Sequence, residues 1–140
     1  MVEKKAEITF TSRWGGDWKA CTFFNKATGD ENMALVKGKI DPANATLVRM
    51  HTLSIFADIY GEESERSELL HRSMELIGQE GCGVIVVISR PMQRLMSRTI
   101  EIKNSYRAGQ ELPTEEMRDS GVDAQLLAEF VVHHMVLLTN

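Results

Sequence analysis

The amino-acid sequence predicts a mixed α+β fold, with an N-terminal antiparallel β meander followed by an α/β half. Three observations support this. Short β-prone segments separated by turns fill the first fifty or so residues, and helix formers dominate from Gly61 onward. A continuous apolar run at residues 84–88 then interrupts two helical patterns, as a strand buried on both faces would. With 140 residues the chain has the length of one domain, so we expect residues 1–140 to form a single unit.

Four β-strands are predicted in the first part of the chain. They are residues 6–11, 18–24, 32–37 and 46–53. Turn sequences separate them at residues 13–17, at residues 26–30 and at Asp41-Pro42. Because each connection is short, we expect the four strands to pair in order as an antiparallel meander.

Helices are predicted on both sides of the apolar run. Residues 62–80 are rich in helix formers and place Leu69, Leu70, Met74 and Ile77 on one stripe, with Gly81 and Gly83 bracketing the end. A second helix is expected after Pro91, within the cationic residues 90–107. The remaining predictions are a break at Pro113, a helix start at residues 114–116, a helix at 123–132 and a short strand at 135–138.

Composition and charge exclude several classes of protein. The formal net charge of −4 gives no basic field that would attract nucleic acid or an anionic membrane. No stretch approaches about 18 apolar residues, and the N-terminus does not resemble a signal peptide. The two cysteines, Cys21 and Cys82, lie far apart and do not form a disulfide framework. We therefore expect a cytoplasmic protein with no membrane or nucleic-acid partner.

The residues alone leave the chemistry open. Arg90, Arg94 and Arg98 are spaced four apart and could form an anion clamp on one helix face, or equally a solvated face. The four histidines have no ligand-like spacing, which is more typical of surface or hydrogen-bonded core residues than of a zinc site. The charged residues 115–119 favour an ordinary helix start.

Several short motifs, spread in order along the chain, resemble one known family. They read ALVKGKI at residues 34–40, LVRMH at 47–51, EGCGV at 80–84, RDSGVDAQLL at 118–127 and VLLTN at 136–140. Residues 6–15 fit the same family's opening strand and turn. By these motifs the chain is similar to GTP cyclohydrolase II over essentially its whole length.

The resemblance implies a function and a set of site residues. Family members hydrolyse GTP with zinc and magnesium, release formate and pyrophosphate in riboflavin synthesis, and are typically dimers. Many are fused to 3,4-dihydroxy-2-butanone 4-phosphate synthase. The implied partners are a guanine nucleotide, a second copy, and that synthase or an active cyclohydrolase. The implied substrate-binding residues are Arg49, Arg90 and Arg94, and the implied catalytic residues, relic or residual, are Tyr106, Glu116 and Arg118.

The sequence departs from the family where the family binds zinc. Three cysteines hold the metal in the family pattern SECLTGDVFGSLRCDCG, which here becomes TLSIFADIYGEESERS at residues 52–67. The cysteine positions fall on Ser54, Glu65 and Ser67, or on Ser54, Ser64 and Arg66 with a one-residue gap. A serine hydroxyl is a poor zinc ligand, and one glutamate cannot replace three thiolates. We therefore expect no zinc and no resident cofactor, with Mg²⁺ accompanying a bound nucleotide.

Other departures concern the substrate loop and the chain length. The family's RQEGRGIG becomes RPMQRLMS at residues 90–97, which keeps both arginines and loses the glycines. The chain between Tyr106 and Arg118 is shorter by roughly ten residues, a contracted loop. The chain also ends where members usually continue, so we expect a fold shortened at its C-terminus.

These departures predict a degenerate homologue and leave three hypotheses. The first is a zinc-free, catalytically inactive domain with a regulatory or interaction role in riboflavin biosynthesis. The second is a residual enzyme that releases pyrophosphate from GTP or hydrolyses the nucleotide in an altered way. The third is a structural dimerisation domain without a ligand.

Overall fold

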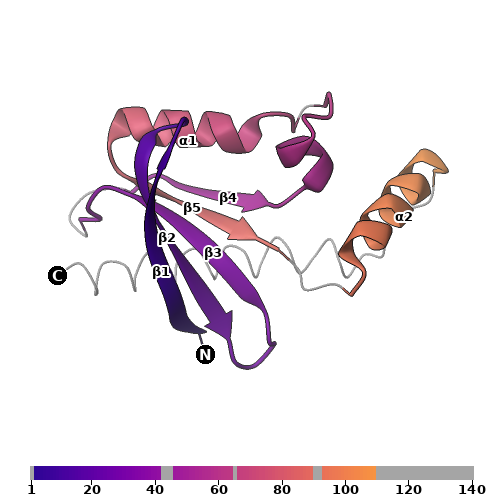
Figure 1. Cartoon of the computed structure of the whole chain (residues 1–140), viewed down its shortest axis with the longest axis horizontal. Helices are drawn as coiled ribbons and strands as arrows, with labels where there is room; N and C mark the ends of the chain where they lie inside the picture. Colours follow the sequence, from indigo (N-terminus) through magenta and orange to yellow (C-terminus); the bar gives the residue numbers. More distant parts are fainter. Residues whose placement is uncertain (1, 42–45, 65, 90–92, 110–140) are drawn as a thin grey trace.

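A five-stranded mixed β-sheet forms the body of the protein, with one helix packed on one face (Figure 1). The computed structural model describes residues 2–41, 46–64, 66–89 and 93–109. The elements are β1 (Val2–Ser12), β2 (Gly16–Asn25), β3 (Glu31–Lys37), β4 (Val48–Thr52), the π-helix η1 (Ile55–Ile59), α1 (Leu69–Glu80), β5 (Gly83–Ile88) and α2 (Leu95–Arg107). The predictions for residues 113–138 lie outside the described residues. The α+β class, with antiparallel strands first and an α/β part after them, is confirmed.

The first three strands form the predicted antiparallel meander. β1 pairs with β2, from Val2 opposite Asn25 to Ser12 opposite Gly16, and β2 pairs with β3. The register of β1 shifts between Lys4 and Glu7, a bulge that limits the regularity of this edge strand. β1 is longer than the predicted strand at residues 6–11. Pairing with β2 extends it over residues whose own hydrophobic pattern does not alternate.

The fourth strand is not part of the meander. The sheet order is β1-β2-β3-β5-β4, so β5 separates β4 from β3. β4 runs parallel to β5, from Val48 opposite Val84 to Thr52 opposite Ile88. The prediction for residues 46–53 was therefore right about a strand and wrong about its partner. Parallel strands need a crossover connection, which η1 and α1 supply here.

Helix α1 begins later than predicted. Residues 62–64 are not helical, residues 66–68 form a turn, and Glu68 precedes the helix with a left-handed φ of 65°. The predicted apolar stripe is confirmed in its buried part, since Met74 and Ile77 face the sheet. The helix ends at Gly81 (φ 81°), and Gly83 opens β5 instead of ending the helix.

The core lies on both faces of the sheet. On the α1 face the buried cluster is Trp18, Ala20, Leu35, Met74, Ile77 and Ile85. On the other face it is Cys21, Phe23, Ala34, Val36, Ile40, Val84 and Val86. Alternate residues of β5 enter the two clusters, which confirms the prediction of a strand buried on both faces for Val84, Ile85 and Val86. Val87 and Ile88 are only half-buried.

The turn between β1 and β2 rests directly on α1. The Trp14 ring stacks on the His71 ring with centroids 3.5 Å apart, and the Trp18 indole N–H donates to the Trp14 carbonyl at 2.9 Å. A Cβ added at Gly78 would lie 2.6 Å from the Cα of Gly15. Two glycines therefore allow the turn and the helix to approach at backbone contact.

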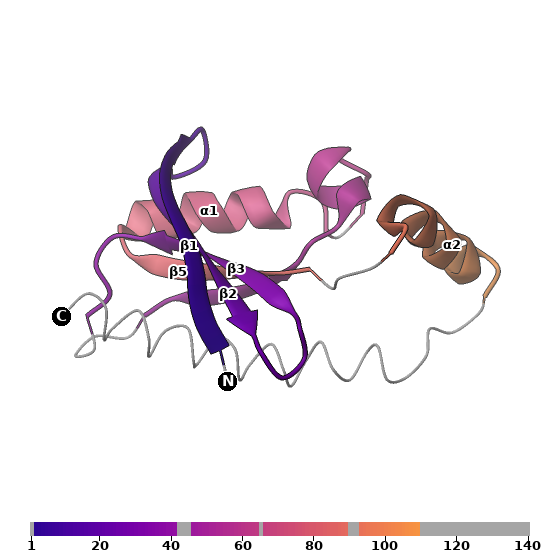
Figure 2. The ribbon, with the colours of Figure 1, turned by 60° about the horizontal axis from the view of Figure 1, so that its bottom comes forward.

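Helix α2 stands beyond the sheet and begins at Leu95 (Figures 1 and 2). The prediction of a helix after Pro91 is confirmed, and Arg94 precedes the helix with a left-handed φ of 55°. Because Arg94 lies before the helix, it does not share a helical face with Arg98, and Arg90 lies outside the described residues. None of the helix's own residues is buried. No helix in the described ranges is long and apolar enough to cross a membrane.

Candidate functional site

The candidate site lies at the carboxyl ends of the parallel strands β4 and β5. Thr52 and Ile88 lie opposite each other there, and both strands leave the sheet at this edge. β4 continues into η1, and the chain beyond β5 leads to α2 (Figure 2). Ligands of α/β sheets bind outside the carboxyl ends of the strands. The topology therefore brings η1, residues 60–64 and 66–68, and α2 to the edge where a ligand is expected.

A buried hydrogen-bond cluster holds the turn between β4 and η1. Oδ2 of Asp58 lies 2.8 Å from Nε2 of His51 and accepts the backbone N–H of Ser54 at 2.8 Å. The side chains of His51 and Asp58 are only 9% and 5% exposed. The Ser54 hydroxyl accepts the backbone N–H of Ala57 at 3.3 Å and so caps η1. The Ser54 side chain therefore has a local structural role.

A second cluster of serines shapes the turns before α1. The Ser67 hydroxyl donates to the carbonyl of Glu62 and accepts the backbone N–H of Ser64 at 3.0 Å. The Ser64 hydroxyl in turn accepts the backbone N–H of Arg66 at 3.2 Å. Both hydroxyls thus satisfy backbone groups of an irregular segment, which is the usual role of serine in turns.

One ion pair joins these turns to α2. The ammonium of Lys103 lies 2.6 and 2.7 Å from the two carboxylate oxygens of Glu62. The same ammonium is 4.7 Å from the centroid of the Phe56 ring, and Tyr60 meets that ring edge-on at 5.4 Å. A carboxylate, a cation and an aromatic face thus meet between η1 and α2.

The predicted substrate-binding and catalytic residues are only partly placed. Arg49 is exposed on the edge strand β4, Arg94 is exposed before α2, and the Tyr106 side chain on α2 is 57% exposed. Within the described ranges no hydrogen bond or ion pair joins these three residues. Arg90, Glu116 and Arg118 lie outside the described residues.

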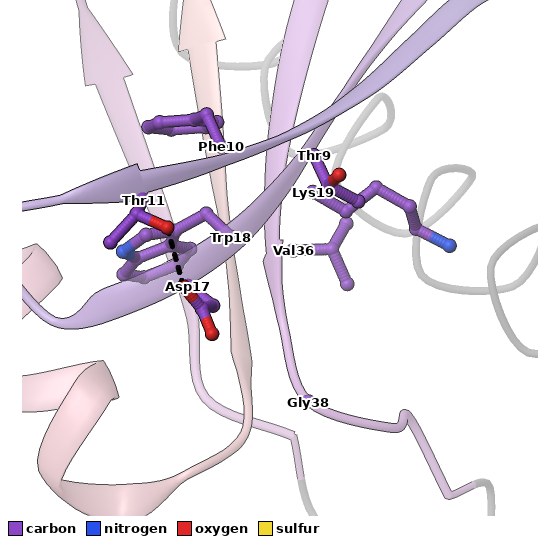
Figure 3. A pocket seen from close by; sticks show the side chains of 8 residues that line it. All are labelled: Thr9, Phe10, Thr11, Asp17, Trp18, Lys19, Val36 and Gly38. Atoms are coloured by element: carbon purple, nitrogen blue, oxygen red, sulfur yellow. Dashed lines mark hydrogen bonds between the residues drawn. The ribbon is translucent and has the colours of Figure 1, made fainter.

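A hollow of about 500 Å³ lies against β1, β2 and the end of β3, away from β4 (Figure 3). It is lined by Thr9, Phe10, Thr11, Asp17, Trp18, Lys19, Val36 and Gly38. Gly38 follows β3 at the end where Lys37 lies opposite Gly83, the first residue of β5. The hollow is therefore separate from the carboxyl ends of β4 and β5. Its polar groups include internal pairs, such as Thr11 donating to Asp17 at 2.7 Å.

Comparison with known proteins identifies the family. The family model described as GTP cyclohydrolase II matches residues 3–140, nearly the whole chain. The chain belongs to the GTP cyclohydrolase II family. The resemblance seen in the short motifs is confirmed by this match.

Similar curated proteins come from bacteria and from a plant. The riboflavin biosynthesis protein RibBA of Parabacteroides distasonis is 30% identical, over all of this chain and 37% of its own length. RibBA of Phocaeicola vulgatus is 28% identical with the same coverage. The monofunctional riboflavin biosynthesis protein RIBA 2, chloroplastic, of Arabidopsis thaliana is 32% identical, over all of this chain and 30% of its own length. The chain spans about a third of the length of the curated relatives it matches.

In this member of the GTP cyclohydrolase II family, the expected zinc position Ser54 lies in the buried hydrogen-bond cluster after β4. Ser64 and Ser67 lie in the serine cluster before α1. Glu65 lies outside the described residues. Across the described ranges, no three His, Cys, Asp or Glu side chains converge on a point where a metal could bind. Cys21 is buried in the middle of the sheet, where burial raises the pKa of its thiol, and Cys82 donates to the carbonyl of Lys39 at 3.2 Å. Both thiols lie in the sheet-face cluster around β2, β3 and β5.

Sequence reasoning missed four residues that shape this edge of the sheet. Asp58, Phe56, Glu62 and Lys103 received no role, although Asp58 coincides with the aspartate of the family pattern and Lys103 lies in the cationic residues 90–107. His51 was expected to be a surface or hydrogen-bonded core residue, and its buried pair with Asp58 confirms the second of these. The aspartate shared with the family pattern SECLTGDVFG was an available signal for Asp58.

Proposed function

We propose that this chain is a GTP cyclohydrolase II-like domain of riboflavin biosynthesis that does not hydrolyse GTP through zinc and that has a regulatory or interaction role. The family match and the names of the relatives support the pathway. In this proposal residues 1–140 act as one domain, which pairs with a second copy. Its regulated partner is a 3,4-dihydroxy-2-butanone 4-phosphate synthase or an active cyclohydrolase.

The chemistry of the former zinc positions carries the proposal. Ser54 and Ser67 use their hydroxyls to satisfy backbone groups, and so does Ser64 in the alternative alignment. The remaining candidates are Arg66, whose cation repels a metal, and Glu65, a single carboxylate. Zinc prefers thiolate, imidazole and carboxylate ligands in a tetrahedral set. The residues present do not fit such a site, so the zinc-activated water that would attack the guanine ring has no support here.

A guanine nucleotide is the ligand we propose for this domain. Arg49 is exposed on β4 and Arg94 is exposed just before α2, and neither guanidinium has an ion-pair partner within the described ranges. The planar guanidinium group suits phosphate oxygens better than any other side chain. With Arg90 and Arg118, these residues would hold the triphosphate and its Mg²⁺, while Tyr106 and Glu116 would persist as relics of catalysis.

The test is a thermal unfolding measurement with the nucleotide. The full chain is heated with and without millimolar GTP and Mg²⁺, and the zinc content of the same sample is determined. A ligand at a hundred times its dissociation constant stabilises a protein by about 2.7 kcal/mol, worth several degrees in Tm. We expect that shift in a zinc-free sample and its loss in Arg94→Ala.

Two results would change the proposal. The absence of any GTP-dependent shift would mean that the arginines do not bind a nucleotide and would favour a structural dimerisation domain. Pyrophosphate release from GTP that disappears in Arg118→Ala would favour the residual enzyme, since phosphoryl chemistry depends on positioning and charge more than on zinc.

A further inference from the structure

The polar contacts that join helix α2 to the other described elements run through a single side chain, Lys103. It buries none of its own residues, and Leu95, Met96 and Ile100 are among its exposed apolar side chains. Within the described ranges, every hydrogen bond or ion pair between α2 and another element passes through Lys103. Isolated helices shorter than about 12–15 residues are marginal in water. The 13 residues of α2 therefore need an external contact to stay ordered.

The contact at Lys103 is stronger than an ordinary surface ion pair. Its ammonium binds both oxygens of the Glu62 carboxylate and lies over the Phe56 ring. The two charged side chains are only 28% and 34% exposed, so water screens them less than it screens open pairs. An exposed ion pair contributes little, whereas a shielded pair with a cation–π contact contributes more.

Glu62 is also part of the turn before α1, through a contact that does not involve Lys103. Its carbonyl accepts the hydroxyl of Ser67, while its carboxylate binds Lys103. One residue therefore joins the serine cluster before α1 to the helix beyond β5. The sequence separation of 41 residues shows that this is a tertiary link rather than a local one.

We propose that Glu62 is a positioning residue, which links the turn around Ser67 to α2 without a metal and so fixes the orientation of that helix. The helix places Lys103, Arg107 and Tyr106 on one structural unit, next to Arg94 at its start. The inference rests on the proposed function in one respect, namely that no zinc organises these turns. Because the link is electrostatic, it weakens as ionic strength rises.

Amide hydrogen exchange of the full chain tests this link. In Glu62→Gln the charge is lost while the shape is kept, and we expect the α2 amides to exchange about three- to tenfold faster. Glu101→Gln is the matched control, because among the described residues the Glu101 carboxylate pairs only with Arg98 on the same helix, at 3.1 Å. The double variant Glu62→Lys with Lys103→Glu restores the pair with reversed charges and should return the exchange rates toward those of the wild type.

Several outcomes would overturn the inference. Unchanged α2 exchange in Glu62→Gln, an equal effect in Glu101→Gln, or no recovery in the charge-swapped variant would each contradict a role for Glu62. Faster α2 exchange in the wild type after treatment with a zinc chelator would show that a metal holds the helix. Formate release from GTP, by contrast, would contradict the proposed function and leave the Glu62→Gln result standing, so the two failures are distinguishable.

Discussion

Asp58 organises the turn that follows β4, because one of its oxygens serves two partners. Oδ2 meets the His51 ring nitrogen and the Ser54 backbone N–H, each at 2.8 Å, in a place with almost no solvent access. A buried polar group that loses its partner costs more free energy than the hydrogen bond itself contributes. The conformation of Ser54 therefore depends on a carboxylate four residues further along the chain.

Replacing Asp58 by alanine should destabilise the protein by about 1–3 kcal/mol, because it leaves the His51 ring nitrogen and the Ser54 N–H without their acceptor. Denaturant unfolding monitored by Trp fluorescence measures the change. Asp17→Ala is the matched control, since Asp17 is exposed and its carboxylate, among the described residues, accepts only the Thr11 hydroxyl. Its cost should stay within about 0.5 kcal/mol. Equal effects of the two substitutions would show that the buried cluster adds nothing to stability.

At the residue scale, the sequence identified the lost zinc ligands more readily than the contacts that the residues at those positions now make. Alignment with the family motif marks Ser54 as a lost zinc ligand, because that comparison needs only the order of residues. The partner of Ser54 depends on η1, a π-helix of five residues, which is too short to have a recognisable periodicity. The Glu62–Lys103 pair spans 41 residues and has no local signal at all.

At the element scale, the contact between the β1–β2 turn and α1 depends on the absence of a side chain at Gly78. Replacing glycine by alanine in a helix interior normally stabilises it by about 1 kcal/mol. Here the new Cβ would lie 2.6 Å from the Cα of Gly15 and 3.1 Å from its carbonyl oxygen. Backbone atoms cannot move aside as a flexible side chain can, so the clash should outweigh the gain.

Gly78→Ala should therefore destabilise the protein by about 1–2 kcal/mol, in the range of overpacked cores. It should also disturb the stacked Trp14 and His71 rings, which lie in the same contact. Gln79→Ala, at the exposed neighbouring position, should be neutral within about 0.5 kcal/mol. Unfolding by denaturant compares the two variants, and a Gly78→Ala protein more stable than the wild type would show that the turn and the helix are not in backbone contact.

Element type was predictable from the sequence, but element partnership was not. The strand at residues 46–53 was expected from its composition, and β4 forms within it. Alternation and turn residues say nothing about whether a strand pairs with its predecessor or with a later strand, and β4 pairs with β5. Likewise the helical pattern near residue 100 was found, but its start was not, because Arg94 adopts a left-handed φ that arginine rarely takes.

At the scale of the whole molecule, family membership and catalytic competence are separate questions. The fold and the family match extend over nearly the whole chain, because motifs that define strands and turns are kept. The chemistry that a fold supports depends on a few side chains, such as those at the expected zinc positions 54 and 67 here. Those side chains can change while the sheet, its register and its two-faced core remain as they are.

The proposed absence of zinc-dependent hydrolysis is tested most directly by formate release. The full chain is incubated with GTP and Mg²⁺, with and without added equimolar zinc, and formate and protein-bound zinc are measured in the same samples. We predict no formate above the protein-free control and much less than one zinc ion per chain. Formate produced in proportion to protein, and abolished by a zinc chelator, would show that this domain is an active cyclohydrolase and would contradict its proposed zinc-free role.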